Sequence, residues 1–358
     1  MTTFILRRIV LTIPVLFGIL ALTFLLTRLI PGRPCTAIYG ERATEALCSA
    51  FDARYGLNDP LGQQFLNYVG RVMTGDLGDS IRLSRPVVDL LAERLPVTVE
   101  LAFAALFFAV IIGVPAGIIS AYKRNTPADY FTMIIANIGV SMPVFWLGLM
   151  LAYMFAVVLR DTPFALPPSG RLDAGTQIVP FFVQWGLVTD ATTASPILVF
   201  ISRLYTVNAI LTANTALFTN SVRHLILPAI AVGTISMSII ARMTRSSVLE
   251  TLNQDYVRTA RAKGLRELTV VMRHAFRNSL LPIITIISLN FGLLISGAVL
   301  TETIFGLTGV GRTLFDGISS RDYPLVQGFT FFIAFAFVLI NLLVDILYGY
   351  LDPRIRLS

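Results

Sequence analysis

Charge is scarce in this chain of 358 residues: Asp, Glu, Lys and Arg make up 14% of it, whereas 55% of the residues are hydrophobic. A soluble domain carries about a quarter charged residues. Too few charged side chains are therefore present to cover a folded surface in water, and the composition favours a membrane protein. The net charge of +7, which in a soluble protein would suggest a nucleic-acid partner, then indicates a cationic membrane face instead. We expect no nucleic-acid partner.

Cysteine, histidine and lysine are also rare. The two Cys and two His residues are too few for a zinc ribbon or a Cys/His cluster, and no HExxH motif occurs. The lysines, Lys123 and Lys263, are followed by Arg124 and Gly264, so neither belongs to a Gly-Lys-Ser/Thr phosphate loop. We therefore expect that this chain binds no metal or cofactor, does not hold ATP by that route, and is not an enzyme.

What is abundant is apolar sequence. A helix needs about 18 or more apolar residues to cross roughly 30 Å of hydrocarbon. Six runs reach or approach this length: 9–30, 97–121, 131–159, 225–241, 278–300 and 325–351. The first lacks a cleavage site and is too long for a signal peptide. The sequence predicts an all-α integral membrane protein with six transmembrane helices.

A seventh apolar stretch, 196–218, is interrupted by Arg203 and several Asn and Thr residues, and we expect it to stay outside the membrane. If the chain has six spans and a cytoplasmic N-terminus, its short segments on the cytoplasmic side carry more cations than acids. Both lysines also lie in these segments. A seventh span would move the Arg-rich segment 242–277 outside, against the positive-inside rule. Both termini are predicted to be cytoplasmic.

This topology divides the chain into four parts. The part 31–95 forms an external cap with helical pieces at 42–55 and 61–73, separated by the turn sequence Gly-Leu-Asn-Asp-Pro. The others are the tail and first helix, 1–30; a five-span core, 96–351, with external segment 160–223 and cytoplasmic loop 242–277; and the tail 352–358.

The cytoplasmic loop is the most informative segment. A short helix is predicted from Tyr256 to Lys263, ended by Gly264. A second helix over 267–277 has apolar residues at helical spacing, which would pack on the membrane stem: Leu268, Val271, Met272 and Ala275. A basic amphipathic helix on anionic lipid explains the arginines. It does not explain the small residues Ala260, Ala262 and Gly264, which let another protein approach closely.

The loop resembles the EAA loop of ABC importer permeases, in particular the B-type subunits of dipeptide and oligopeptide importers. The resemblance rests on Asp-Tyr-Val-Arg-Thr-Ala-Arg-Ala-Lys-Gly at 255–264 and Arg-Asn-Ser-Leu-Leu-Pro at 277–282. Arg258, Thr259 and Ala260 stand where the wider superfamily has Glu-Ala-Ala, so only the second Ala and the Gly match, a departure typical of the peptide branch. Further matches lie at 75–80, 141–146, 168–171, 241–246, 301–305, 321–326 and 352–354.

The resemblance implies a type I ABC importer permease fold in a bacterial cytoplasmic (inner) membrane. It also implies four partners besides membrane lipid: a homologous C-type permease subunit, two cytoplasmic ATPases that carry ATP and Mg²⁺, and an external peptide-binding protein. The residues implied in ATPase coupling are Asp255, Tyr256, Arg258, Ala260, Arg261, Ala262, Lys263 and Gly264. Tyr256, Ala260 and Gly264 would supply contact and shape. The cations among them either pair with acids on the ATPase or are solvated.

For the transport pathway, the fifth span carries a weakly polar face that either lines a cavity or packs against another helix: Ser288, Asn290, Gly292 and Ser296. Asp345 in the sixth span is expected to pair with a nearby cation such as Arg354. No span offers the several fixed charges of a tight dipeptide site, which is consistent with an external protein choosing the peptide.

Cys35 and Cys48 both fall in the first outer loop, 13 positions apart. The outer side of a bacterial membrane is oxidising, so the pair predicts a disulfide, although two free buried thiols are the alternative. The bond would tie the entry strand to the helix that begins near Arg42, fixing the rim on which a binding protein docks.

Two other classes of function fit the sequence less well. A secondary transporter would show paired repeats and coupling-ion ligands, and a membrane scaffold would not need the loop at 242–277. Within the family, nickel, glutathione or opine-like cargo stays open, as do the partners' identities and the resting conformation.

Overall fold

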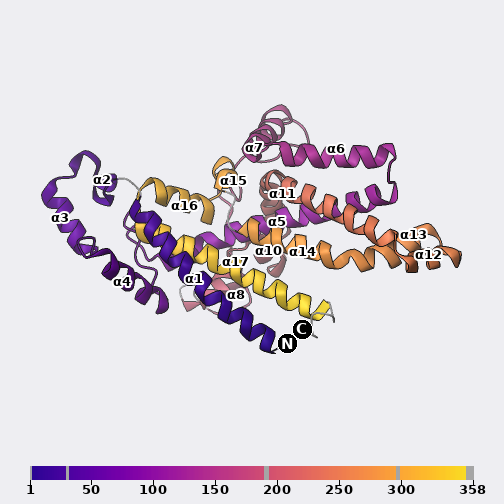
Figure 1. The fold of residues 1–358 in the computed structure, drawn as a ribbon. Coiled ribbons are helices and arrows are strands. Elements are labelled where there is room, and N and C mark those ends of the chain that lie inside the picture. Colours follow the sequence, from indigo (N-terminus) through magenta and orange to yellow (C-terminus); the bar gives the residue numbers. More distant parts are fainter. Residues whose placement is uncertain (1, 30–31, 189–192, 296–298, 352–358) are drawn as a thin grey trace.

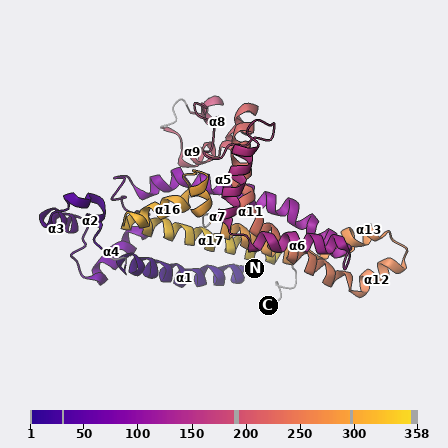
Figure 2. The same ribbon diagram turned by 90° about the horizontal axis from the view of Figure 1, so that it is seen from above.

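The computed structural model describes residues 2–29, 32–188, 193–295 and 299–351, and its elements within these ranges are helices. Figures 1 and 2 show an elongated molecule. The helices α2 (Pro34–Tyr39) and α3 (Glu45–Arg54) lie at one end, and α12 (Asp255–Ala262) and α13 (Glu267–Thr269) lie at the other. The all-α prediction is confirmed.

Within the described residues, five segments are long and apolar enough to cross a membrane on their own. They are α1 (Thr2–Leu29), α5 (Val87–Tyr122), α11 (Thr215–Leu252), α14 (Arg277–Ile295) with the preceding α13 and π-helix η4 (Val270–Phe276), and α17 (Tyr323–Leu351). They contain most or all of the first, second, fourth, fifth and sixth predicted spans, and they make the chain a multi-pass membrane protein.

The third predicted span differs from a single straight helix. It consists of α6 (Pro127–Ser141) and α7 (Val144–Tyr153), continued by the π-helix η2 (Met154–Val158), with a bend of 102° between the two halves. Met142 is extended (φ −77°, ψ 129°), because the ring of Pro143 disfavours helical geometry in the residue before it. The six predicted spans are reached when this bent pair counts as one.

The helices α5 and α11 form the centre of the bundle (Figure 1) and pack closely. A Cβ added to Gly117 would lie 2.5 Å from the Ala241 carbonyl oxygen, and one added to Gly113 would lie 2.7 Å from that of Met237. Farther along, a Cβ on Gly233 would lie 2.7 Å from the Ala105 carbonyl oxygen. Small residues allow this close approach of two backbones in a membrane, so α5 and α11 pack as one unit.

The predicted external segment 160–223 carries α8 (Phe181–Gln184), α9 (Pro196–Ser202), α10 (Tyr205–Leu211) and the start of α11. The stretch 196–218 is divided among the last three, so it forms no continuous spanning helix. Glu100 on α5 anchors this segment: its carboxylate accepts hydrogen bonds from Arg171 Nη2 at 2.7 Å and Thr206 N at 2.6 Å.

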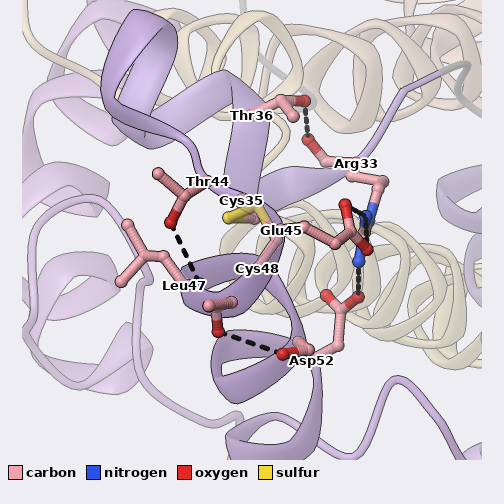
Figure 3. Close-up of polar contacts among 10 residues, drawn as sticks. Arg33, Cys35, Thr36, Thr44, Glu45, Leu47, Cys48 and Asp52 are labelled. Carbon is pink, nitrogen blue, oxygen red and sulfur yellow. Dashed lines mark hydrogen bonds and ion pairs between the residues drawn. A yellow bond between two sulfur atoms is a disulfide. The ribbon is translucent and has the colours of Figure 1, made fainter.

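The cap consists of α2, the short helix η1 (Gly40–Arg42), α3 and α4 (Leu61–Met73). The predicted helical piece 61–73 coincides with α4. Cys35 on α2 and Cys48 on α3 are joined by a disulfide, and Arg33 pairs with Glu45 at 3.1 Å and Asp52 at 2.6 Å beside it (Figure 3). The start of α2 is thus held to α3 by a covalent bond and by ion pairs.

Candidate functional site

The short helix α12 sits at the tip of α11, at the end of the molecule opposite the cap (Figures 1 and 2). Only Asn253 and Gln254 separate the two helices, and Gln254 is extended (φ −77°, ψ 152°). Gly264 stops the helix with φ +75°, a left-handed conformation that favours glycine. The helix α12 is therefore attached to the end of the long helix α11 by a two-residue link.

One face of α12 is buried in the loop itself. Val257 and Ala260 are 0% and 5% exposed and pack against Val270 of η4 and Leu252 of α11. The sequence placed Ala260 at a surface for another protein, and this is wrong in the structure. Residues three apart lie on the same helix face, so the methyl group of Ala260 follows Val257 into the loop. Ala262 and Gly264 are exposed.

The opposite face of α12 is charged. Arg258 pairs with Asp255 at 3.3 Å, and Arg261 pairs with Glu267 at 2.6 Å. The hydrogen bonds that Arg261 donates to Glu267 raise the pKa of the Arg261 guanidinium. Among the described residues Lys263 forms no ion pair. Exposed ion pairs of this kind stabilise by only about 0–1 kcal/mol, so these cations can exchange their partners for acids on another protein.

An exposed apolar rim lies beside this charged face, formed by Leu265, Leu268 and Met272. The sequence placed Leu268 and Met272 on the face that packs against the stem, together with Val271 and Ala275. Only Val271 and Ala275 are buried there. The cause is the π-helix η4, whose i→i+5 hydrogen bonds break the α-helical spacing. Exposed apolar side chains rimmed by charge are typical of a protein-binding surface.

Tyr256 links the two ends of the loop. Its ring is half exposed, and its hydroxyl oxygen accepts a hydrogen bond from Asn278 Nδ2 at 2.9 Å, at the start of α14. The loop therefore connects α11 and α14 through side chains as well as through the backbone.

A buried carboxylate joins three helices at this same end of the bundle. Asp129 of α6 is 2% exposed and accepts hydrogen bonds from Arg245 Nε of α11 at 2.8 Å and Nη2 at 2.9 Å. The Ser120 hydroxyl of α5 also donates to it, as does Asn125 N at 3.0 Å. Sequence analysis did not single out this cluster, because Asp129 and Arg245 are 116 residues apart.

The three predicted pathway residues that the structure describes, Ser288, Asn290 and Gly292, lie in different surroundings. Asn290 is 4% exposed and lines a pocket of about 390 Å³ between α7, α11, α14 and α15 (Val299–Ile304), together with Ser236 and Thr301. Gly292 packs against α17, since a Cβ there would lie 3.1 Å from the Phe337 ring. Ser288 is half-buried and does not line this pocket.

Other predicted residues lie outside the part of the chain that the structure describes, namely Ser296, Arg354 and the side chain of Asp345. Ser236 and Thr301 were not predicted, because isolated hydroxyl residues in apolar helices usually mediate packing. Across the described ranges, no group of three or more His, Cys, Asp or Glu residues could hold a metal ion.

Comparison with known proteins matches two related family models over most of the chain. Residues 113–357 match the binding-protein-dependent transport system inner membrane component, and residues 1–102 match the corresponding N-terminal component. The chain is 44% identical over 356 residues to the dipeptide transport system permease protein DppB of Alkalihalophilus pseudofirmus, covering 99% of this chain and 100% of the relative.

Two further relatives are similar over almost their full length. The di/tripeptide transport system permease protein DppB of Pseudomonas aeruginosa is 45% identical over 357 residues, 99% of each chain. The dipeptide transport system permease protein DppB of Escherichia coli K12 is 42% identical over 363 aligned positions, again 99% of each. With a family match over more than half of its length and relatives of this similarity, the chain belongs to the inner membrane components of binding-protein-dependent transport systems.

Proposed function

We propose that this chain is the B-type permease subunit of an ABC importer that moves dipeptides or short oligopeptides across the bacterial cytoplasmic membrane. The full-length similarity to permeases named for dipeptide and di/tripeptide transport is the observation that carries the proposal. The helix α12, with its charged face and apolar rim, supports the ATP-driven class, because a secondary transporter is driven by coupling ions and would not need a surface for a cytoplasmic ATPase.

The proposed assembly contains a homologous C-type permease subunit, two cytoplasmic ATPases and an external peptide-binding protein. ATP and Mg²⁺ would bind to the ATPases. In this arrangement both termini and α12 are cytoplasmic, and the cap 31–95 and the segment 160–223 face outward. The bias of cations toward the short inner segments supports this orientation.

Coupling follows from the way α12 is attached. An ATPase that closes would push on the exposed residues Tyr256, Arg258, Arg261, Ala262, Lys263 and Gly264, with Asp255 and the buried Ala260 shaping the helix. The 38 residues of α11 extend over about 57 Å. Because α11 packs closely on α5 and is joined to α6 through Arg245 and Asp129, a push on α12 would move these three helices together.

We further propose that the pocket beside Asn290 is part of the passage, together with the hydroxyl groups of Ser236 and Thr301. Uncharged hydrogen-bonding groups on apolar walls suit the amide groups that all peptides share. They would not select a particular side chain, which leaves the choice of peptide to the external binding protein. Ser288 and Gly292 would then serve helix packing more than contact with cargo.

The test is uptake by proteoliposomes that contain the complete complex and its binding protein. Labelled dipeptide should enter only when ATP is supplied on the α12 side. Excess unlabelled dipeptide should abolish the signal, whereas nickel ions, glutathione and opines should not. Competition by one of these ligands would identify a different cargo within the family, and uptake without ATP would contradict the ABC assignment.

A further inference from the structure

A small basic pocket lies at the cap end of the molecule, away from the pocket beside Asn290. It has a volume of about 180 Å³ and lies between the loop that follows α4, the start of α5, α16 (Val310–Ser319) and the start of α17. Three arginines line it, Arg82, Arg94 and Arg312, together with Asp316 and Asp322. Arginine is the side chain best suited to pair with a carboxylate in two-pronged geometry.

The carboxylate oxygens of Asp322 accept hydrogen bonds from groups other than the arginine side chains. Asp322 is 0% exposed and accepts hydrogen bonds from Ser80 Oγ at 2.5 Å, Ile81 N at 3.1 Å and Arg82 N at 3.1 Å. These bonds hold the backbone of Arg82 against the start of α17. Asp322 therefore builds the wall of the pocket.

The guanidinium groups are left with unused donors. Within the described residues neither Arg82 nor Arg312 forms an ion pair. Arg94 pairs with Glu93 at 3.3 Å, but Glu93 is shared with Arg85 at 3.0 Å, and Arg94 Nε is buried without a hydrogen-bond partner. A buried donor without a partner is costly, which points to an acceptor supplied from outside the chain.

The wall on the α16 side is fixed in advance. Glu302 is 0% exposed and accepts hydrogen bonds from Thr98 Oγ1 at 2.7 Å and from Arg312 N at 2.8 Å. The first turn of α16, which carries Arg312, is thereby held to α5. A preformed site avoids the entropic cost of ordering these groups when a ligand binds.

Gly317 and Leu325 pack closely in the wall of the pocket. A Cβ on Gly317 would be 2.5 Å from Leu325 Cδ2, and Leu325 is 3% exposed.

From this geometry we infer that the pocket formed by Arg82, Arg94 and Arg312 receives an Asp or Glu side chain of the external binding protein and fixes its position on the permease. The inference rests on the proposed function, since it requires such a protein. Complementary charges at an interface steer the partner, fix its register and speed its association more than they raise its affinity.

The test measures ATPase activity of the reconstituted complex against the concentration of its dipeptide-loaded binding protein. The double variant Arg82→Gln/Arg312→Gln should raise the concentration for half-maximal stimulation roughly tenfold with unchanged basal ATPase activity. The double variant Arg82→Lys/Arg312→Lys should restore much of the affinity. Arg124→Gln, exposed in the turn between α5 and α6 and away from the cap, is the matched control and should leave the half-maximal concentration unchanged.

The outcomes separate this inference from the proposed function. If the binding protein does not stimulate even the wild-type complex, the proposed function fails. If it stimulates the wild type and the double variant at the same concentrations, the docking inference is wrong. It is also wrong if only uptake of peptides with a free C-terminal carboxylate is lost, because the pocket then contacts cargo. Should the double variant assemble poorly, Arg82→Gln alone, at an exposed position, should still weaken docking about threefold.

Discussion

Arg245 of α11 donates two hydrogen bonds to the carboxylate of Asp129 of α6, from Nε at 2.8 Å and from Nη2 at 2.9 Å. The carboxylate is 2% exposed, and the Arg245 side chain is 28% exposed. This pair joins α11 to α6 a few turns from α12. Under the proposed function it would pass movement of α12 to the bent third span.

Asp129→Asn should destabilise the protein by about 3 kcal/mol, because breaking a buried pair leaves the remaining charge poorly compensated. We also expect fewer dipeptides to be taken up per ATP hydrolysed. Thermal unfolding in detergent and the uptake-to-ATPase ratio in proteoliposomes measure the two effects. Asp255→Asn breaks the exposed pair with Arg258 and is the control for stability, where the loss should stay below about 1 kcal/mol. Equal stability losses in both variants would contradict the role of Asp129.

The seam between α5 and α11 should not tolerate added volume. Gly117→Ala should destabilise the protein by about 1–3 kcal/mol, because its Cβ would lie 2.5 Å from the Ala241 carbonyl oxygen. Gly70→Ala in α4 is the matched control, since no atom lies within 4 Å of a Cβ there. Alanine at that position should stabilise the helix by about 0.5–1 kcal/mol. Thermal unfolding of both variants decides the point, and an unchanged melting temperature for Gly117→Ala would show that the helices do not pack this closely.

The disulfide between Cys35 and Cys48 should stabilise the cap. Closing a loop with a sequence separation of 13 residues is expected to contribute about 3 kcal/mol by restricting the unfolded chain. Replacing both cysteines with serine should lower the unfolding temperature of the cap. Mass spectrometry of a non-reduced digest, from protein purified without reductant, checks the bond itself. Two peptides with free thiols would contradict it.

The orientation of the chain predicts opposite labelling at its two ends. In intact cells a membrane-impermeant thiol reagent should label Thr215→Cys. It should label Arg266→Cys only after the cells have been permeabilised. Both positions are exposed in the structure, so access is limited only by the membrane. External labelling of Arg266→Cys would overturn the proposed topology and revive a span at 196–218.

Much of this fold could be predicted from local sequence, because long apolar runs, turn residues and a glycine stop act over short distances. The helix α4 and the stop at Gly264 are examples. The bend at Met142 could not be predicted from the apolar pattern, because the apolar run continues through Pro143. The exposure of Leu268 arises from a π-helix, which the spacing of apolar residues does not reveal.

Contacts between residues far apart in the sequence also could not be predicted. Asp322 contacts residues about 240 positions earlier, and Arg245 contacts Asp129 across 116 positions. A single sequence holds no record of such contacts. The basic pocket depends on them, since Arg82 and Arg312 come together only after the bundle has folded.

The most direct test of the account compares ATP-driven dipeptide uptake by the wild-type complex with uptake by Gly264→Val and Gly264→Asn. At φ +75°, a β-branched residue is strongly disfavoured, whereas asparagine is tolerated. The account predicts that the Gly264→Val complex still assembles but that its uptake rate falls at least about tenfold, which corresponds to roughly 1.4 kcal/mol or more of coupling free energy. The Gly264→Asn complex should retain most of the uptake. Full uptake by an assembled Gly264→Val complex, or uptake that needs no ATP, would contradict coupling through α12.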